Sequence, residues 1–397
     1  MESTKFAPHN AKRLKTFRYI SLATCAFVAL ILIANNKNAL VGDQFTQMIS
    51  LSAKGKNAKT MPPILVWNAE YYGDAMLRML EGFVAGYPSL SDKVKCSHSC
   101  DYTDDRRIET NASAIIFFLH EKCPIDVWPQ HRRADQTYVM FTAESPVNTL
   151  PYYNRSIMTD TWFNATVTYR TDSTVVMPYD RLIRITPDTP EEDIWTDLEV
   201  LNKVRNKSAL AFQVVSNCNA SSGRELLVKK LSEFMPIDVS GGCTQRACDQ
   251  NCYWQKMDSH FFYLAFENSV CTQYVTEKFW RSLRALTVPV VLRRAVLAGV
   301  EVPQNAFIAA DDFGSVKELA DHLKALQNDT KRYLQHFEWT KRYRKSHFAI
   351  LNSPLCTLCQ FAHRQFEQDL TNNVNLDNHW TTKDCKTNFV QNFLIKN

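Results

Sequence analysis

The stretch FYLAFENSVCTQYVTEKFW, residues 262–280, changes character twice along its length. Its first part, 262–266, is a continuous apolar run that is typical of a strand buried on both faces. From Val275 onwards the spacing predicts a helix. The turn and the first helical turn together carry two carboxylates, an amide and an ammonium: Glu267, Asn268, Glu277 and Lys278.

Apolar runs of the same kind recur along the 397-residue chain, with helical spacing between several of them. Strands that alternate with helices predict parallel, doubly wound sheets, and two such series predict two facing α/β domains with a cleft between them. The expected strands are 64–67, 114–119, 138–141, 173–179, 209–217, a short one near Ile237, 262–266, 288–292 and 307–310. The expected helices are 223–235, 275–286 and 315–327.

The N-terminal region points to the secretory pathway. Residues 19–34 are uncharged and mostly apolar, and a long basic stretch precedes them. This run is slightly shorter than the roughly 17–25 residues of a membrane-spanning helix, so a signal anchor and a cleaved signal peptide both fit. The long basic stretch favours an anchor, with residues 1–18 in the cytoplasm and the bulk of the chain in the lumen. Residues 35–60 are polar and are expected to form a stem.

The composition argues against a nucleic-acid partner and favours an oxidising compartment. The net charge of +5 is spread along the chain, and no run rich in Lys and Arg occurs in the globular part. Of the 12 cysteines, only Cys25 lies in the apolar segment, which suits disulfide bonding. Several glycans are expected on the six Asn-x-Ser/Thr sequons that follow this segment. These sequons are Asn111, Asn154, Asn164, Asn206, Asn219 and Asn328.

Two strand-to-helix turns of the second half carry the groups that an anionic ligand needs. In an open parallel sheet, ligands bind where strands end and helices begin. Arg224 follows the turn of Ser216 and Asn217, and Lys278 follows the turn after 262–266. Both cations are expected near helix N-termini, which attract anions, so the pattern predicts a diphosphate site. The alternative, that both are ordinary solvated helix residues, stays open.

Three common nucleotide-binding patterns are absent from the sequence. The chain has no GxxxxGK(S/T), no GxGxxG and no Asp-x-Asp, the pair with which many glycosyltransferases hold a metal on a sugar nucleotide. Fixed cations would therefore have to stabilise a leaving diphosphate.

The opening stretch, followed by VPVVL at 288–292, resembles the signature of the α1,3-fucosyltransferases, glycosyltransferase family 10. Ordered matches extend from about residue 100 to 360. The resemblance implies an inverting Golgi enzyme of the GT-B type, with two Rossmann-like domains and GDP-fucose as donor. It implies no required metal cofactor, and it leaves manganese stimulation and a homodimer open. The further matching segments are YVMFTAESP (138–146), TVTYRTDSTVVMPY (166–179), VVSNCNASSGRELLVKKL (214–231) and CTLC (356–359).

Carried over onto matching positions, the resemblance assigns roles to individual residues. Glu144 matches the family's proposed catalytic base, and Arg224 and Lys278 match its diphosphate-contacting cations. The base would take the proton of an acceptor hydroxyl while the cations stabilise the departing GDP on the opposite face, which inverts the anomeric centre. The donor-lining positions are matched by Ser216, Asn217, Glu267, Asn268, Tyr274 and Glu277, with Tyr179 facing the cleft.

The chain departs from the family pattern at three positions. Gln273 stands where many members have Asp, Leu286 stands where a Gly usually precedes the VPVV strand, and Arg284 falls on a helix face expected to be packed. These departures keep open a catalytically silent glycan-binding or regulatory protein of the same fold. A glycoside hydrolase is a third hypothesis, but it explains the placement of Arg224 and Lys278 poorly.

The cysteines are interpreted as forming structural disulfides, because CTLC lacks the second CxxC motif that a zinc site would need. The resemblance implies cross-links between an early and a late pair of cysteines: Cys96 and Cys100 with Cys356 and Cys359. Pairing elsewhere stays open for Cys243, Cys248 and Cys252, with Cys218 or Cys271 as partners for some of them.

Together these observations predict fucose transfer from GDP-fucose to the 3-OH of a GlcNAc residue in glycoprotein glycans. The protein is expected to be a single-pass type II Golgi membrane protein with its catalytic part in the lumen. The acceptor stays open among the N-glycan core, antennal LacNAc or LacdiNAc, and glycolipid. The expected parts are a tail (1–18), an anchor (19–34), a stem (35–60), an acceptor-side domain (61–190), a GDP-fucose domain (191–365) and a C-terminal tail (366–397).

Overall fold

The computed structural model describes residues 61–68, 97–98, 100–120, 125, 127–345, 354–368 and 374–395. The expected cytoplasmic tail, anchor and stem lie outside these residues. Within the described parts of the chain, no helix combines the length and the apolar character needed to cross a bilayer.

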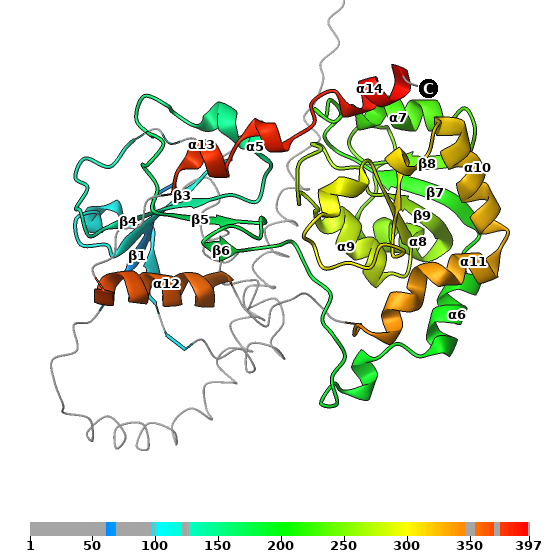
Figure 1. The fold of residues 1–397 in the computed structure, drawn as a ribbon, viewed down its shortest axis with the longest axis horizontal. Helices are drawn as coiled ribbons and strands as arrows, with labels where there is room; N and C mark the ends of the chain where they lie inside the picture. The colour runs from blue at the N-terminus through cyan, green and yellow to red at the C-terminus, as the bar shows by residue number, and fades with distance from the viewer. Residues whose placement is uncertain are drawn as a thin grey trace, which may run out of the picture. The chain divides into compact units, whose positions relative to one another are not determined.

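The first half of the described chain forms a parallel six-stranded sheet in the order β2-β1-β3-β4-β5-β6 (Figure 1). Its central strands are buried along their whole length, as their continuous apolar runs predict. The strands are β1 (Ile64–Val66), β2 (Tyr102–Thr103), β3 (Ala114–Phe118), β4 (Thr137–Phe141), β5 (Ala165–Thr168) and β6 (Val175–Val176). The sequence analysis missed β5, and the strand expected over 173–179 is reduced to two residues of β6.

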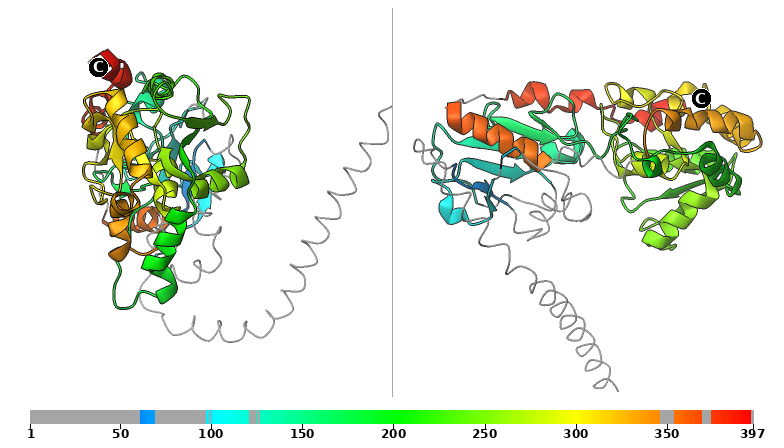
Figure 2. Two further views of the ribbon diagram at one scale, coloured as in Figure 1. Left: turned by 90° about the vertical axis from the view of Figure 1, so that its right-hand side faces the viewer. Right: turned by 90° about the horizontal axis from the view of Figure 1, so that it is seen from below.

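One face of this sheet is covered from the far end of the chain. Helix α12 (Pro354–Gln368) packs Leu358, Phe361 and Ala362 against strand residues such as Ile116, and Figure 2 shows it lying along the strands. The expected 191–365 domain therefore contains a helix that belongs to the core of the first sheet. The boundary at residue 365 does not separate the two cores.

The second half forms a parallel five-stranded sheet in the order β11-β10-β9-β7-β8. Its strands are β7 (Ala209–Val214), β8 (Ile237–Ser240), β9 (His260–Leu264), β10 (Val288–Val291) and β11 (Ile308–Ala309). Its longer helices are α6 (Asp197–Arg205), α7 (Arg224–Leu231), α8 (Gln250–Ser259), α9 (Glu277–Arg284) and α10 (Val316–Gln327). The expected α/β class with parallel sheets is confirmed, whereas α8 lies where only a cysteine-rich loop was expected.

Local sequence explains where these helices begin. Helix α6 has a full capping box in which Thr196 and Glu199 satisfy each other's backbone N–H groups. Ser315 caps α10, which buries Leu319 and Leu323 among other apolar residues at helical spacing. Thr276 caps α9, and this cap lies next to the charged turn of the opening stretch.

The strand within the opening stretch is shifted relative to its apolar run. It was expected over 262–266, but β9 covers His260–Leu264. Phe266 is nevertheless fully buried, because the chain continues through the core before it reaches Glu267. The apolar run therefore predicts which residues are buried, whereas the hydrogen-bonded strand ends two residues before the end of the run.

Candidate functional site

A charged cluster forms where β9 leads into α9. The Glu267 carboxylate is 8 % exposed and accepts hydrogen bonds from the Thr276 backbone N–H (2.8 Å) and from the Thr276 hydroxyl (2.8 and 2.9 Å). The Lys278 ammonium lies 3.3 Å from Glu267 Oε2 and 3.0 Å from Glu277 Oε1. The turn thus brings together three of the predicted residues, and it engages both oxygens of Glu267 with the protein itself.

Burial and mutual charge set the protonation of this cluster. Burial raises the pKa of the Glu267 carboxyl, and the Lys278 charge only partly offsets it. Burial acts to raise the pKa of Glu277 as well, but its contacts with Lys278 bring it below the usual range. Burial alone would lower the pKa of Lys278, yet the two neighbouring carboxylates raise it well above the ordinary value. Lys278 is therefore a fixed cation at the start of α9.

Arg224 lies at the start of α7, as predicted, but its side chain is only 3 % exposed. Its Nη1 donates to the Phe266 carbonyl oxygen (2.9 Å) and its Nη2 to the Asn217 carbonyl oxygen (2.7 Å). Nε donates to Glu225 Oε1 at 3.2 Å. Arg224 therefore connects the turns after β7 and β9. A guanidinium has five N–H donors, and these three bonds leave two of them for other partners.

The turn after β7 is exposed and cross-linked. Ser216 and Asn217 are both exposed, and the next residue, Cys218, forms a disulfide with Cys243 in the turn after β8. Asn268 lies close by, and its carbonyl oxygen accepts from the Ser222 backbone N–H at 2.9 Å. The buried Oδ1 of Asn268 has no hydrogen-bond partner within the described residues. A ligand with a donor group would satisfy this oxygen.

Glu144 follows β4 of the first sheet and is half-buried. Its Oε2 accepts from the Tyr274 hydroxyl at 2.8 Å and from Asn148 Nδ2 at 3.0 Å. Burial raises the pKa of the Tyr274 phenol well above its usual value, so Tyr274 stays protonated and donates this bond. No bond to the second oxygen, Oε1, is found among the described residues. The predicted base is thus held by a residue from the opening stretch.

Tyr179 also lies at this site. Its hydroxyl donates to the Ala143 carbonyl oxygen at 2.7 Å, and its ring lies edge-on to that of Tyr274, with the centroids 6.5 Å apart. Burial raises its pKa far above the ordinary value, and the charges of Glu144, Glu277 and Glu267 add to the effect. Ser145 follows Glu144 in the chain, and the hydroxyl oxygens of the buried Ser145 and Ser269 are 2.9 Å apart. The ends of β4 and β9 therefore meet at one polar site.

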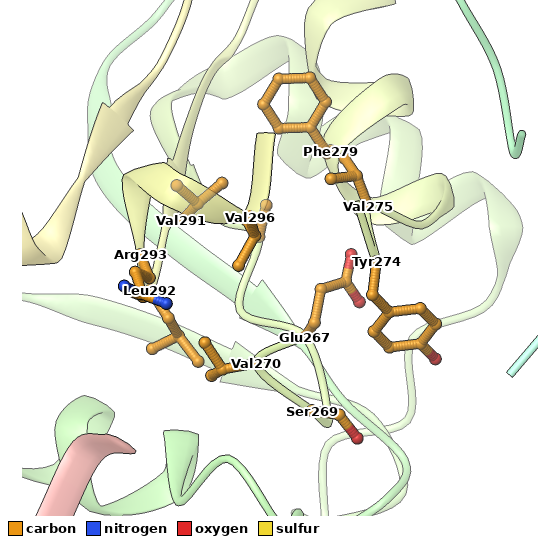
Figure 3. Close-up of a pocket in the computed structure, with 11 residues that line it drawn as sticks. Glu267, Ser269, Val270, Tyr274, Val275, Phe279, Val291, Leu292, Arg293 and Val296 are labelled. Atoms are coloured by element: carbon orange, nitrogen blue, oxygen red, sulfur yellow. The ribbon is translucent and has the colours of Figure 1, made fainter. Parts of the chain in front are cut away.

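A narrow hollow opens beside the cluster, and we call it the β9 hollow. Figure 3 shows Glu267 and Tyr274 lying next to each other, with the aliphatic side chains of Val291 and Val296 across the hollow. Its free volume is about 10 Å³, which is room for one water. The remaining lining residues are Ala265, Ser269, Val270, Val275, Phe279, Leu292 and Arg293.

The three departures from the family pattern have structural explanations. Gln273 and Leu286 have φ angles of 61° and 53°, the left-handed region in which glycine is favoured and the small polar Asn and Asp are tolerated. Gln273 Oε1 accepts from the Thr171 backbone N–H at 2.9 Å, which anchors the turn. Arg284 donates from Nε to the buried carboxylate of Asp180 at 2.6 Å. All three side chains are accommodated without removing a site residue.

Four disulfides join cysteines of the described chain: one is an implied cross-link, one (Cys218–Cys243) is a pairing that the sequence left open, and two were not foreseen. Cys100 bonds to Cys359, one of the two implied cross-links, and Cys356 is also disulfide-bonded. Cys96 lies outside the described residues. The pairs Cys218–Cys243 and Cys248–Cys252 lie within the crowded loop region. Cys271, an open candidate for that loop, instead bonds to Cys385 of the C-terminal tail.

The six sequons differ in accessibility. Asn111, Asn154, Asn206, Asn219 and Asn328 are exposed, as glycan attachment to a folded protein requires. Asn164 is 4 % exposed, and its Oδ1 accepts from the Tyr138 backbone N–H and from Arg132 Nη2, both at 2.8 Å. A glycan on Asn164 is incompatible with this packing.

Sequence reasoning missed two residues that hold the predicted carboxylates. Thr276 holds Glu267, and its place directly before a charged helical turn is a recognisable N-cap signal. Asn148 holds Glu144 from four residues further on, a spacing that brings side chains together on one turn of helix. Neither residue carries charge, so neither was singled out.

These features define an α/β protein whose two parallel sheets place carboxylates and fixed cations at the ends of their strands. Models of two family segments match the chain: "Fucosyltransferase, N-terminal" over residues 59–180 and "Glycosyltransferase family 10 (fucosyltransferase) C-term" over residues 204–377. The α-(1,3)-fucosyltransferase C of Drosophila melanogaster is 32 % identical over 77 % of this chain and 76 % of its own length. The chain belongs to glycosyltransferase family 10.

Two further relatives and one solved structure are also similar to the chain. The α-(1,3)-fucosyltransferase fut-1 of Caenorhabditis elegans is 32 % identical over 75 % of this chain and 65 % of its own length. The human 4-galactosyl-N-acetylglucosaminide 3-α-L-fucosyltransferase FUT6 is 32 % identical over 74 % of this chain and 77 % of its own length. A crystal structure of an α1,3-fucosyltransferase with GDP-fucose covers 81 % of this chain at 16 % identity and a TM-score of 0.49.

Proposed function

We propose that the protein is an inverting α1,3-fucosyltransferase that moves L-fucose from GDP-β-L-fucose to the 3-OH of a GlcNAc residue in glycoprotein glycans. Family membership and the names of the relatives support this activity. The proposal takes the two sheets as the Rossmann-like domains of a GT-B enzyme. The proposal covers a GlcNAc acceptor in either the N-glycan core or an antenna.

The observation that carries the proposal is the setting of Glu144. Its carboxylate is half-buried, and one oxygen is held by Tyr274 and Asn148. The other oxygen is the group we assign to the proton of the attacking hydroxyl. The acceptor oxygen forms its bond to fucose C1 as that proton moves to Glu144 and the bond from C1 to the β-phosphate oxygen breaks. General-base assistance of this kind is worth about 10²–10⁴-fold in rate.

The cations of the second sheet would stabilise the departing GDP. Lys278 lies at the start of α9, where backbone N–H groups already favour an anion, and its pKa keeps it charged. Arg224 contributes from the start of α7 with the N–H donors that its bonds to the backbone do not use. Ser216, Asn217, Asn268 and Glu277 border the same turns and are proposed to line the nucleotide and the sugar.

The β9 hollow must widen, or the ligand must lie outside it, because it holds only about one water. We therefore place the diphosphate along the exposed edge formed by Ser216, Asn217 and Lys278 rather than inside the hollow. Fixed cations supply the charge stabilisation that a metal would otherwise give, so no metal is part of the proposed reaction. Stimulation by manganese is tested by adding it to the assay below.

The disulfides suit a protein of the oxidising secretory pathway, and we propose a single-pass type II Golgi membrane protein with a luminal catalytic part. Immunofluorescence with selective permeabilisation tests this topology. Staining of a C-terminal tag without permeabilisation of the Golgi membrane would contradict it. Sedimentation of the purified chain tests for a homodimer.

The deciding experiment incubates the full chain with GDP-fucose and a panel of glycans that end in or contain GlcNAc. We expect transfer to at least one glycan, with loss of transfer in Glu144→Gln. Glu338→Gln is the matched control, since Glu338 is half-exposed and its ion-pair partner among the described residues is Lys341 on the surface. GDP binding without transfer to any glycan would instead support the catalytically silent relative, and fucose release without transfer would support a hydrolase.

A further inference from the structure

A second hollow lies away from the charged turn, and we call it the crossover hollow. It is formed where the segment after β6 meets the C-terminal end of α9 and the chain around residues 339–345. Two backbone bonds join the crossing segments: Ile185 N donates to Arg342 O, and Arg344 N donates to Ile183 O, both at 2.9 Å. The hollow therefore lies beneath a pair of antiparallel segments.

Three buried N–H donors belong to residues that line this hollow and have no acceptor among the described residues. They are Nε1 of Trp195, Nε1 of Trp339 and Nε of Arg344. Trp339 is 2 % exposed, so water at the surface does not satisfy its indole. An unsatisfied buried donor costs about 1–3 kcal/mol, so three in one place call for a common partner.

Other indoles of the protein show that this situation is unusual. Trp280 lines the same hollow, and its Nε1 donates to the Val275 carbonyl oxygen at 3.2 Å. Trp67 and Trp380 likewise donate to Val127 O and Thr149 Oγ1, at 2.7 and 2.8 Å. Within the described chain, the two buried indoles without an acceptor both line the crossover hollow.

The charges around the hollow favour an anion. Arg181, Arg284, Arg344 and Lys345 line it, and Asp180 is its one lining carboxylate. Arg284 forms an ion pair with Asp180. Arg344 pairs with Asp193 and Lys345 pairs with Glu199, and these two carboxylates do not belong to the lining. Counted over the described residues, these four cations exceed the three carboxylates by one positive charge.

The number of donors separates an anion from a water molecule. A water accepts two hydrogen bonds and must place two hydrogens of its own, whereas the residues around this space carry three N–H donors without an acceptor among the described residues. The free volume of about 10 Å³ holds one water-sized sphere and excludes a phosphate or sulfate. A monatomic anion accepts hydrogen bonds from several donors at once and needs no acceptor in return.

We propose that the crossover hollow binds one halide ion, chloride under physiological conditions. The ion accepts from Trp195 on one crossing segment and from Trp339 and Arg344 on the other, and so links the two segments beside the end of α9. The opposite end of α9 carries Glu277 and Lys278. The site is independent of the proposed transfer reaction, because it takes neither donor nor acceptor.

The test measures halide binding to the full chain by thermal unfolding and by the line width of the ³⁵Cl resonance. Chloride is titrated against gluconate at constant ionic strength. We expect a saturable rise in Tm of about 2–4 °C and a ³⁵Cl broadening that bromide competes away. Trp195→Phe, at a half-buried position, is expected to lose both effects while it keeps the fold.

Two further variants control for general salt effects and for misfolding. Trp254→Phe changes a tryptophan that is 37 % exposed, and it is expected to retain the halide response. Arg344→Lys keeps the charge but removes the Nε donor, and it is expected to weaken halide binding. A Tm that does not depend on the halide, or a response that Trp195→Phe retains, would overturn the proposal in favour of an ordered water.

Discussion

Glu144 and Glu267 are both carboxylates that follow a buried strand, one from each sheet, yet they are held in different ways. Glu267 is buried, and both of its oxygens are bonded within its own turn by Thr276 and Lys278. Glu144 is half-buried, and within the described chain its Oε2 alone is bonded, by Tyr274 and Asn148. The comparison teaches that position after a strand brings a carboxylate to the site, whereas the number of satisfied oxygens separates a reactive group from a structural one.

The largest effect expected from this comparison is on the reaction itself. Glu144→Gln removes the proton acceptor but keeps the shape of the side chain and its contact with Tyr274. We expect fucose transfer to fall about 10²–10⁴-fold with an unchanged Tm. Initial rates of transfer from GDP-fucose and a thermal melt measure both quantities. Transfer that survives in Glu144→Gln would break the assignment of Glu144 as the base.

The matching change in the second sheet is expected to act on stability. Glu267→Gln leaves the Lys278 ammonium with one carboxylate neighbour fewer and removes the charge that accepts from Thr276. Since hydrogen bonds to charged groups are worth about 1.5–3 kcal/mol, we expect a loss of about 2–3 kcal/mol in the free energy of unfolding. Urea denaturation measures it, with Glu338→Gln as a control expected within about 0.5 kcal/mol of wild type. A Glu267→Gln protein of full stability would contradict the structural role.

Tyr274 links the two carboxylate environments and is expected to position Glu144. Tyr274→Phe removes the 2.8 Å bond and keeps the buried ring in place. We expect kcat to fall about 10-fold, which corresponds to roughly 1.4 kcal/mol, while KM for GDP-fucose stays unchanged. Steady-state kinetics at varied GDP-fucose separates the two parameters. A rise in KM alone would mean that Tyr274 contacts the donor instead.

The sequence predicted the parts of this site that depend on local pattern. Continuous apolar runs identified β3, β4 and β10, because residues of a parallel sheet are buried on both faces. The turn after β9 gathered Glu267, Glu277 and Lys278 as expected, since strand, turn and helix are adjacent in the chain. The family pattern usually has a glycine at the position of Leu286, and the φ angle of 53° at this position explains that preference.

The sequence could not predict the parts that depend on distant contacts. Nothing local indicates that Cys271 pairs with Cys385, or that α12 covers the first sheet. The bond from Tyr274 to Glu144 joins residues 130 positions apart. The burial of Arg224 likewise follows from the carbonyl groups of two separate turns. In each case tertiary packing selects one partner among many that the residue types allow.

The comparison extends to the ammonium groups of two lysines, Lys278 and Lys207, and here the expected effect is on how the free energy of unfolding depends on pH. Lys278 has two carboxylate partners, whereas the acceptors of Lys207 among the described residues are neutral: Met257 O at 2.9 Å and Thr287 Oγ1 at 2.8 Å. Burial lowers the pKa of Lys207 from 10.5 to about 7. Between these two values the unfolded chain holds a proton that the folded chain lacks, so this group makes stability rise with pH across that window.

Lys207→Met is expected to remove that rise, which amounts to at most about 1.4 kcal/mol per pH unit for one proton. Below pH 7 both states of the wild type are protonated at Lys207, so its penalty is then complete and the variant gains most in relative stability. Urea unfolding from pH 6 to pH 10 measures the slope, with the exposed Lys229→Met as the matched control. Equal slopes in wild type and Lys207→Met would mean that the fold keeps this ammonium charged without a carboxylate. Neutral acceptors would then be enough to keep a buried ammonium charged, and the two carboxylates beside Lys278 would not be needed to fix its charge.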